Sequence, residues 1–471
     1  MFSFALSLDP KARSPMYEQL YRALAEAIRG GALRSGEKLP SKRALCALLG
    51  VSRATVENAD ELLRAEGYVE ARARSGFDAA EYQLLPAADS QKAQGTLPCA
   101  PSVSEKTDAS ESTGKRPLYD LSTSAVDVSV FPYASWAKLY KEVVYNSPEL
   151  LQRGDPRGEA ALREALARLL SEYRGVRCAP EQIVVGSGME TLLGQLITLF
   201  GRDAVYAMED PGYPAVERSL LARGRGLRYV PMDAAGMDAE ALEASGAAVA
   251  YLTPSHQFPL GITMPASRRS QLLHWAAAGS RWIIEDDYDS EFRWGGRPIS
   301  SMQGMDRAGR VIYTGTFSRS LAPAIRLAYM VLPPALTEAW RALCGQQQPT
   351  VSRYEQTVMA RFLDGGFYSR YLRRVGKRYA DRRSTLLNAL NRIEGLTVSG
   401  AAGGIHLLLT LPRYSETELL SKAAAAGLSL RGLSEFCRQA PPLPSTLVLG
   451  YGGLPTEQIP CAVSRLREAW K

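Results

Sequence analysis

Residues 315–333 read GTFSRSLAPAIRLAYMVLP, a polar turn followed by an apolar run. Within the turn, Thr316 and Ser318 stand two positions apart, and Arg326 follows Arg319 by seven positions. Hydroxyl groups and a forked guanidinium are good partners for phosphate oxygens. The stretch therefore predicts a phosphate cradle built around one special position, Arg319.

This turn ends one of five short apolar runs that finish in small or polar residues. The runs are QIVVGSG (182–188), AVYAMEDPGY (204–213), AVAYLTPSH (248–256), RWIIEDDYDS (281–290) and RVIYTGTFS (310–318). Helical segments alternate with them, which predicts an α/β fold with a largely parallel sheet and its chemistry at the strand ends. After Pro334, long helical stretches surround GGIHLLLTL and STLVLGYGG, which we interpret as a second, smaller α/β lobe.

Two other strand ends carry candidate site residues. Ser187 and Gly188 follow an apolar run and open a helix, whose first amides can hold an anion; a plain tight turn would have the same sequence. Asp286 follows WII, and a carboxylate so close to a buried strand is not expected to be free in solvent. For the surrounding EDDYDSE, a solvated acidic loop and a magnesium site are the alternatives.

The N-terminal region has a different pattern. Ser41 and Ser52 are placed to cap two short helices, the first ending at Gly50 and the second near Glu66. The first helix would carry Leu45, Leu48 and Leu49, and the second would point Val56, Leu62 and Leu63 inward. Two capped helices joined by a glycine turn predict a helix-turn-helix, and the strand after Tyr68 leads to a basic hairpin tip, a wing.

Composition sets the boundaries. The 471-residue chain changes character near residue 83, where 83–117 is rich in Ala, Ser, Pro and Thr. We expect a DNA-binding domain over 10–82, a flexible linker over 83–117, and a larger domain over 118–471 whose small lobe begins at about 335. The net charge of +7 (56 Lys and Arg, 49 Asp and Glu) permits nucleic-acid binding.

Several functional classes are disfavoured. No run of eighteen apolar residues is present, so we expect no membrane span. Six scattered cysteines without a Cys-x-x-Cys pair fit reduced thiols and a cytoplasmic location. With only three histidines, we expect no His/Cys metal site.

The N-terminal region resembles the GntR-type winged helix-turn-helix, on the segments LPSKR (39–43), LGVSRATV (49–56) and EGY (66–68). The resemblance implies duplex DNA as a partner. The residues that it would bring to DNA are Arg43, Arg53, Thr55, Arg72 and Arg74. Arginine can fork onto guanine edges or onto phosphates, and both interpretations stay open here.

The larger region resembles fold type I pyridoxal-phosphate proteins, the aspartate aminotransferase fold, and the whole chain resembles the MocR/GabR regulators. The blocks that carry this resemblance are GDPRG (154–158), EDPGY (209–213), TPSHQFP (253–259), EDDYDSEF (285–292) and GTFSRSLAPAIR (315–326). It implies a homodimer with two DNA-binding heads and leaves room for a small-molecule effector.

The resemblance also assigns roles to residues. Asp286 would pair with the pyridine nitrogen, Tyr288 would reach the ring hydroxyl, and Tyr213 would pack near the ring. The phosphate would be held by Ser187, Gly188, Thr316, Ser318 and Arg326.

The chain departs from the family where a substrate would react. Arg319 occupies the position of the lysine that forms the Schiff base, and a guanidinium stays protonated and cannot supply a neutral amine. Ala215 and Gly453 stand where related regulators place arginines that hold a carboxylate. Arg153 replaces a common tyrosine, and we interpret it as a compensating phosphate contact.

We therefore expect a transcription regulator with a catalytically disabled aminotransferase-like domain that binds pyridoxal phosphate or pyridoxamine phosphate non-covalently. Two alternatives remain open at this point. One is an active aminotransferase with a fused head, and the other is a regulator whose large domain only dimerises.

Overall fold

A computed structural model describes residues 8–9, 12, 14–72, 76–80, 117–294, 300–441 and 443–471. The expected linker, apart from its last residue, and the wing residue Arg74 lie outside the described residues, as does the side chain of Arg72. We call residues 14–80 the head and residues 117–471 the effector domain. Within the described part of the chain, no helix is long and apolar enough to cross a membrane.

The head has the predicted winged helix-turn-helix. Its helices are α1 (Met16–Arg29), α2 (Lys42–Leu49) and α3 (Arg53–Ala65), followed by the antiparallel strands β1 (Val69–Arg72) and β2 (Gly76–Ala79). Ser41 caps α2 and Ser52 caps α3, each accepting a hydrogen bond from a backbone amide in the first turn, and Gly50 ends α2 in the left-handed conformation. Val56 and Leu63 of α3 are buried and Leu62 is partly buried against the same core, as expected, whereas Leu48 of α2 is 59% exposed.

The effector domain is built on an eight-stranded sheet. Its order is β4 (Ile183–Gly186), β11 (Ala328–Val331), β10 (Val311–Thr316), β9 (Trp282–Asp287), β8 (Val249–Leu252), β5 (Val205–Asp210), β6 (Gly226–Asp233) and β7 (Gly236–Met237). The run from β10 to β6 is parallel, as predicted, whereas β11 is antiparallel to both of its neighbours. The stretch 315–333 thus contains the end of β10, a turn and the returning strand β11.

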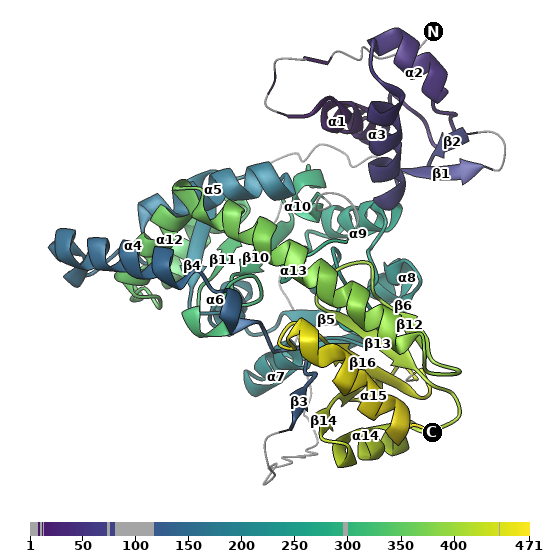
Figure 1. Cartoon of the computed structure of the whole chain (residues 1–471). Coiled ribbons are helices and arrows are strands. Elements are labelled where there is room, and N and C mark those ends of the chain that lie inside the picture. The colour runs from purple at the N-terminus through teal and green to yellow at the C-terminus, as the bar shows by residue number, and fades with distance from the viewer. Residues whose placement is uncertain are drawn as a thin grey trace.

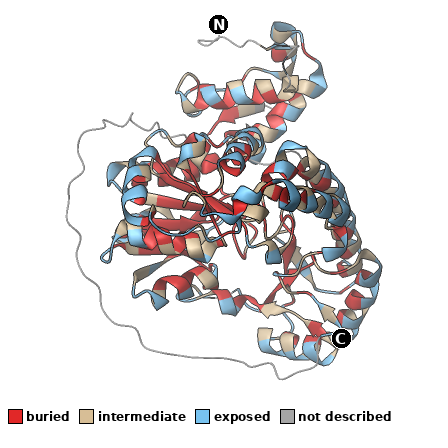
Figure 2. Cartoon of the chain, turned by 90° about the vertical axis from the view of Figure 1, so that its left-hand side faces the viewer, coloured by how far each residue is buried: buried red, intermediate tan, exposed pale blue. Residues whose placement is uncertain are grey.

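Most residues of this sheet are buried (Figure 2), and successive side chains of each strand lie on opposite faces. On one face they pack against α6 (Met189–Phe200), α7 (Pro214–Ala222) and α11 (Pro334–Cys344). On the other they pack against α5 (Ala160–Arg174), α12 (Arg353–Asp364), α9 (Ala266–Ala278) and α10 (Met302–Met305). The sheet is therefore covered on both sides, as a mainly parallel sheet requires.

A second, four-stranded sheet forms the smaller lobe (Figure 1). Its order is β12 (Thr397–Ser399), β13 (His406–Thr410), β16 (Thr446–Gly450) and β15 (Arg431–Gly432). The helices of this part are α14 (Glu416–Ala425) and α15 (Ile459–Ala469), and α13 (Phe367–Leu390) packs on α12 and on α15. The remaining α-helices and strands of the described residues are α4 (Tyr133–Asn146), α8 (Ala239–Ala244), and β14 (Leu428–Ser429), which pairs with β3 (Tyr119–Asp120).

The head rests on the effector domain near α9 (Figure 1). Core residues of α1 and α3 belong to the same hydrophobic cluster as residues of α9, α10 and the large sheet. The backbone amide of Ala266 donates to the carbonyl oxygen of Glu66 at 2.6 Å. The two parts therefore share an interface at the C-terminal end of α3.

Candidate functional site

A pocket of about 370 Å³ opens in the effector domain at the ends of the parallel strands. It brings together seven of the eight expected cofactor residues: Gly188, Tyr213, Asp286, Tyr288, Thr316, Ser318 and Arg326. Arg319 and Ala215 also line it. Ser187 does not: its hydroxyl lies 2.9 Å from that of Thr191, and its amide donates to the hydroxyl oxygen of Thr350 at 3.1 Å.

One end of the pocket is suited to an anion. Gly188 immediately precedes α6, a helix of 12 residues, so the positive end of the helix faces the pocket. Its φ of 139° favours glycine, and a Cβ there would lie 2.3 Å from Nη2 of Arg326. The guanidinium of Arg326 makes no hydrogen bond or ion pair with other residues that the structure describes, so it is available to a ligand.

The turn after β10 adds two hydroxyl groups to this end. The Thr316 hydroxyl donates to Oγ of Ser318 at 3.0 Å, and the Ser318 amide donates to Oγ1 of Thr316 at 3.1 Å. These hydrogen bonds orient both side chains in the turn that lines the pocket. Together with Arg326 and the start of α6, they make a donor set that matches phosphate.

Asp286 forms a second wall of the pocket. It is 6% exposed, and its carboxylate accepts a hydrogen bond from the Tyr251 hydroxyl. Burial raises the pKa of Asp286 to about 7, the charge of Asp287 adds to that rise, and the bond from Tyr251 opposes it. A cation beside Asp286 would favour its ionised form, so this position suits a pyridinium nitrogen.

The segment EDDYDSE is not the solvated acidic loop that was one alternative. Glu285, Asp286, Asp287 and Asp289 are all buried. Each of them has a hydrogen-bond partner in the protein, and Asp287 forms an ion pair with Arg174 at 2.6 Å.

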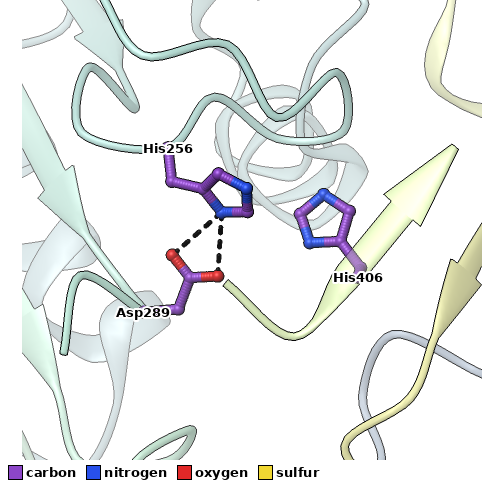
Figure 3. Close-up of side chains that lie close together, drawn as sticks. All are labelled: His256, Asp289 and His406. Atoms are coloured by element: carbon purple, nitrogen blue, oxygen red, sulfur yellow. Dashed lines mark hydrogen bonds and ion pairs between the residues drawn. The ribbon is translucent and has the colours of Figure 1, made fainter. Parts of the chain in front are cut away.

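Tyr288 is held by a buried polar network. Its hydroxyl lies 3.1 Å from Nδ1 of His256, and that nitrogen lies 2.9 Å from Oδ2 of Asp289. His406 lies beside His256, with ring centroids 4.7 Å apart (Figure 3). Burial holds the pKa of His406 well below its usual range, so the ring is neutral and its Nε2 donates to the Pro259 carbonyl at 3.1 Å.

Ligating atoms of His256, Asp289 and His406 all lie within 4.8 Å of one another. Separations this wide are looser than a tetrahedral site with metal–ligand distances near 2 Å requires. Since the carboxylate is already bonded to His256, we interpret the cluster as support for Tyr288.

Arg319 brings a second arginine to the lining of the pocket. Its guanidinium donates to the backbone carbonyl of Thr123. Its positive charge opposes the burial that raises the pKa of Tyr288 and adds to the burial that lowers the pKa of His406. A side chain at Gly453 would meet Ala125, because a Cβ there would lie 2.5 Å from the Ala125 Cβ. The space for an arginine at that position is therefore occupied.

Arg153 does not reach the pocket. It is exposed and donates to the Gln346 carbonyl at 3.0 Å. Within this chain, Arg153 therefore does not make the compensating phosphate contact suggested for it.

Several pocket residues were missed from the sequence. Thr253 and Phe258 line the pocket, and the Thr253 hydroxyl donates to the buried carboxylate of Glu209 at 2.7 Å. Burial raises the pKa of Glu209 to about 7. The signal was present in the EDPGY and TPSHQFP blocks, which the sequence places at neighbouring strand ends.

In the head, Arg53 lies at the first turn of α3 with its side chain 79% exposed, and it pairs with Glu57 at 3.0 Å. Arg43 is exposed on α2. The Thr55 hydroxyl lies 2.9 Å from that of the capping Ser52. These three residues thus gather around α2 and the N-terminal end of α3, the end remote from the effector domain.

Comparisons with known proteins agree with this architecture. Residues 16–78 match the family described as bacterial regulatory proteins, gntR family, and residues 118–466 match aminotransferase class I and II. The HTH-type transcriptional regulator YhdI of Bacillus subtilis is 38% identical, covering 98% of this chain and 97% of that protein. The chain belongs to the MocR/GabR family of regulators.

This MocR/GabR protein is similar both to other regulators and to aminotransferases. The probable rhizopine catabolism regulatory protein MocR of Rhizobium meliloti is 33% identical, over 99% of this chain and 96% of its own. The kynurenine aminotransferase of Pyrococcus horikoshii, solved with PMP, matches with a TM-score of 0.66 and 26% identity, over 74% of this chain and 90% of that one. The MocR/GabR chain thus combines a DNA-binding regulator's head with the fold of a pyridoxal-phosphate-binding family.

Proposed function

We propose that this regulator holds pyridoxal phosphate or pyridoxamine phosphate non-covalently, and that occupancy of the pocket, without catalysis, controls duplex binding by its head. Gly188, Thr316, Ser318 and Arg326 would hold the phosphate. Asp286 would face the ring nitrogen, and Tyr288 and Tyr213 would contact the ring.

The observation that carries this proposal is the contrast between an available Arg326 and an engaged Arg319. In an aminotransferase the cofactor supplies an electron sink for a substrate amine. That chemistry needs a lysine amine to anchor the cofactor and to move a proton. Arg319 has no neutral amine and is bonded to Thr123.

The decisive experiment is calorimetry on the dialysed full-length chain with each cofactor, followed by borohydride and intact-mass analysis. We expect one binding site for each ligand and no mass adduct. A borohydride-fixed adduct, or turnover of an amino acid with an oxo acid, would favour the enzyme. Absence of binding for both ligands would favour a domain that only dimerises.

The DNA arm of the proposal is tested with a duplex selected by the full chain from a random pool. Arg53→Ala should weaken binding by about 1–3 kcal/mol if Arg53 reads a base. Arg64→Ala is the matched control, because Arg64 is an exposed arginine at the other end of the same helix. Equal affinity of the two variants would remove Arg53 from the DNA interface.

A further inference from the structure

Residues 300–303, which we call the docking segment, lie between the head and strand β9. Glu285, the residue before Asp286, is fully buried. Its carboxylate accepts hydrogen bonds from the amides of Met302 at 2.7 Å and Gln303 at 2.8 Å. One end of the docking segment is therefore fixed to the strand that carries Asp286.

Two arginines hold the other end of the segment. Arg269 donates to the Ser300 carbonyl at 2.6 Å, and the Ser301 amide donates to the Arg174 carbonyl at 2.8 Å. Arg174 is in turn paired with Asp287 at 2.6 Å. Glu285 and Asp287, the neighbours of Asp286 in the chain, are thus both bonded to residues that contact the docking segment or belong to it.

The strand geometry explains this division. Successive side chains of a strand point to opposite faces. Ile284 packs with α6 and α7 on the pocket face, and Ile283 packs with α9 on the other. Asp286 shares the face of Ile284 and lines the pocket, whereas Glu285 and Asp287 point the other way, toward the docking segment and Arg174.

The head contacts the same segment. The Tyr21 hydroxyl lies 3.4 Å from Oγ of Ser300, and the Ser300 amide lies 3.5 Å from Oε1 of Glu66. Glu66, the residue that ends α3, is 5% exposed, and the positive charge of Arg269 acts on it. Next to it, a Cβ on Gly67 would lie 2.6 Å from that of Pro265, so the backbones approach closely.

We propose that the docking segment is the surface through which the effector domain holds the head of this chain, and that the charge state at Asp286 sets how firmly it does so. This coupling rests on the proposed function. On β9 the negative charge of Asp287 acts on both Glu285 and Asp286, and a cationic ring nitrogen beside Asp286 would offset the repulsion between Asp286 and Asp287. Glu285 and Asp287 transmit the change because both bond groups that position residues 300–303.

Hydrogen exchange of the full-length chain, with and without pyridoxamine phosphate, tests both parts. Glu66→Gln keeps the shape of the side chain and removes its charge. We expect exchange in α1 and α3 to rise by on the order of tenfold in this variant, since the acceptor of the Ser300 amide becomes a neutral oxygen and the attraction between Glu66 and Arg269 is lost. We also expect the response of the head to pyridoxamine phosphate to disappear.

Glu61→Gln is the matched control, because Glu61 is an exposed glutamate on the same helix. It should behave as the wild-type chain does. If Glu66→Gln does not fold, Tyr21→Phe serves in its place, because it removes one hydroxyl from the same contact. If hydrogen exchange of the head in Glu66→Gln, or in Tyr21→Phe where that is used, equals that of the wild type, the proposal that the docking segment holds the head is contradicted.

Calorimetry on the same samples separates this inference from the proposed function. Normal ligand binding with an unchanged head response in Glu66→Gln would overturn the coupling alone. No binding to the wild-type chain would overturn the proposed function and the coupling with it. The exchange difference between Glu66→Gln and Glu61→Gln would still decide whether the docking surface holds the head.

Discussion

The effector pocket contains two groups of residues with different chemistry, which we call the Arg326 end and the Arg319 end. At the Arg326 end, the start of α6, two hydroxyls and a guanidinium without a described partner are arranged as a phosphate site requires. At the Arg319 end, the guanidinium is bonded to Thr123 and the space beside Gly453 is filled by Ala125, and in the proposed function Arg319 stands where an enzyme would have its anchoring lysine.

This contrast separates binding from chemistry. Phosphate and ring contacts hold a ligand whether or not it reacts. The anchoring lysine and the carboxylate-binding arginines matter only when a substrate must be attached and oriented. A regulator that reads occupancy needs the first set and not the second.

The largest effect is expected from Arg319→Lys. The substitution restores an amine beside an intact ring and phosphate site, so borohydride should convert a chain with no adduct into one that carries the phosphopyridoxyl mass. Turnover of common amino acids should stay negligible, because Ala215 and Gly453 provide no carboxylate clamp.

Arg319→Gln is the control for this experiment, since it also removes the guanidinium but brings no amine. Robust turnover of amino acids by Arg319→Lys would contradict this difference between the two ends and would show that Arg319 alone prevents catalysis. Failure to form any adduct would mean that the Arg326 end is not intact either.

The next largest effect concerns the wall between the two ends. Asp286→Asn should weaken pyridoxamine phosphate binding by roughly tenfold or more, because a hydrogen bond between charged groups is worth about 1.5–3 kcal/mol. Calorimetry measures the loss, with the exposed Asp203→Asn as control. Unchanged affinity would place the ring away from Asp286.

A smaller effect is expected at the phosphate end. Arg326→Gln should weaken pyridoxamine phosphate binding by about three- to tenfold, a modest loss because the residue is exposed and partly screened. Binding of pyridoxamine, which lacks the phosphate, should not change. Arg153→Gln is the matched control, since that arginine lies outside the pocket. Equal losses for both ligands would contradict a phosphate contact at Arg326.

How well the sequence predicted each region depends on how far apart in the sequence its interacting residues lie. The head was predictable because Ser41, Gly50 and Ser52 act within a few residues of themselves. The strand ends were predictable because parallel strands bring their carboxyl ends to one edge.

Longer-range features were not predictable. Tyr251 meets Asp286 only through the pairing of β8 with β9, and Glu66 meets Ala266 only when the head docks. Ser187 follows its strand as expected, but its hydroxyl finds a nearer partner in Thr191. No local pattern carries this information, because each contact depends on how separate elements pack.

The smallest expected effect is a pH dependence that isolates Asp286. Its pKa is about 7 in the folded chain, raised by burial, and near 3.9 in an unfolded chain. Between these values the folded state holds a proton that the unfolded state has lost, so this group's contribution to stability falls as pH rises and is fully lost above about 7.

An asparagine side chain does not titrate, so Asp286→Asn should lose less stability than the wild type between pH 6 and 7, by about 1 kcal/mol. Glu285 and Glu291 also have pKa values raised to about 7, but they are present in both chains and their contributions cancel in the difference. The pKa of Glu209 is raised to about 7 partly by the charge of Asp286, so the variant lowers it, which changes the difference in the same direction. Urea midpoints of the ligand-free chains at the two pH values measure it. Parallel midpoints would show that Asp286 is ionised throughout, and that the wall between the two ends of the pocket is already charged before a ligand arrives.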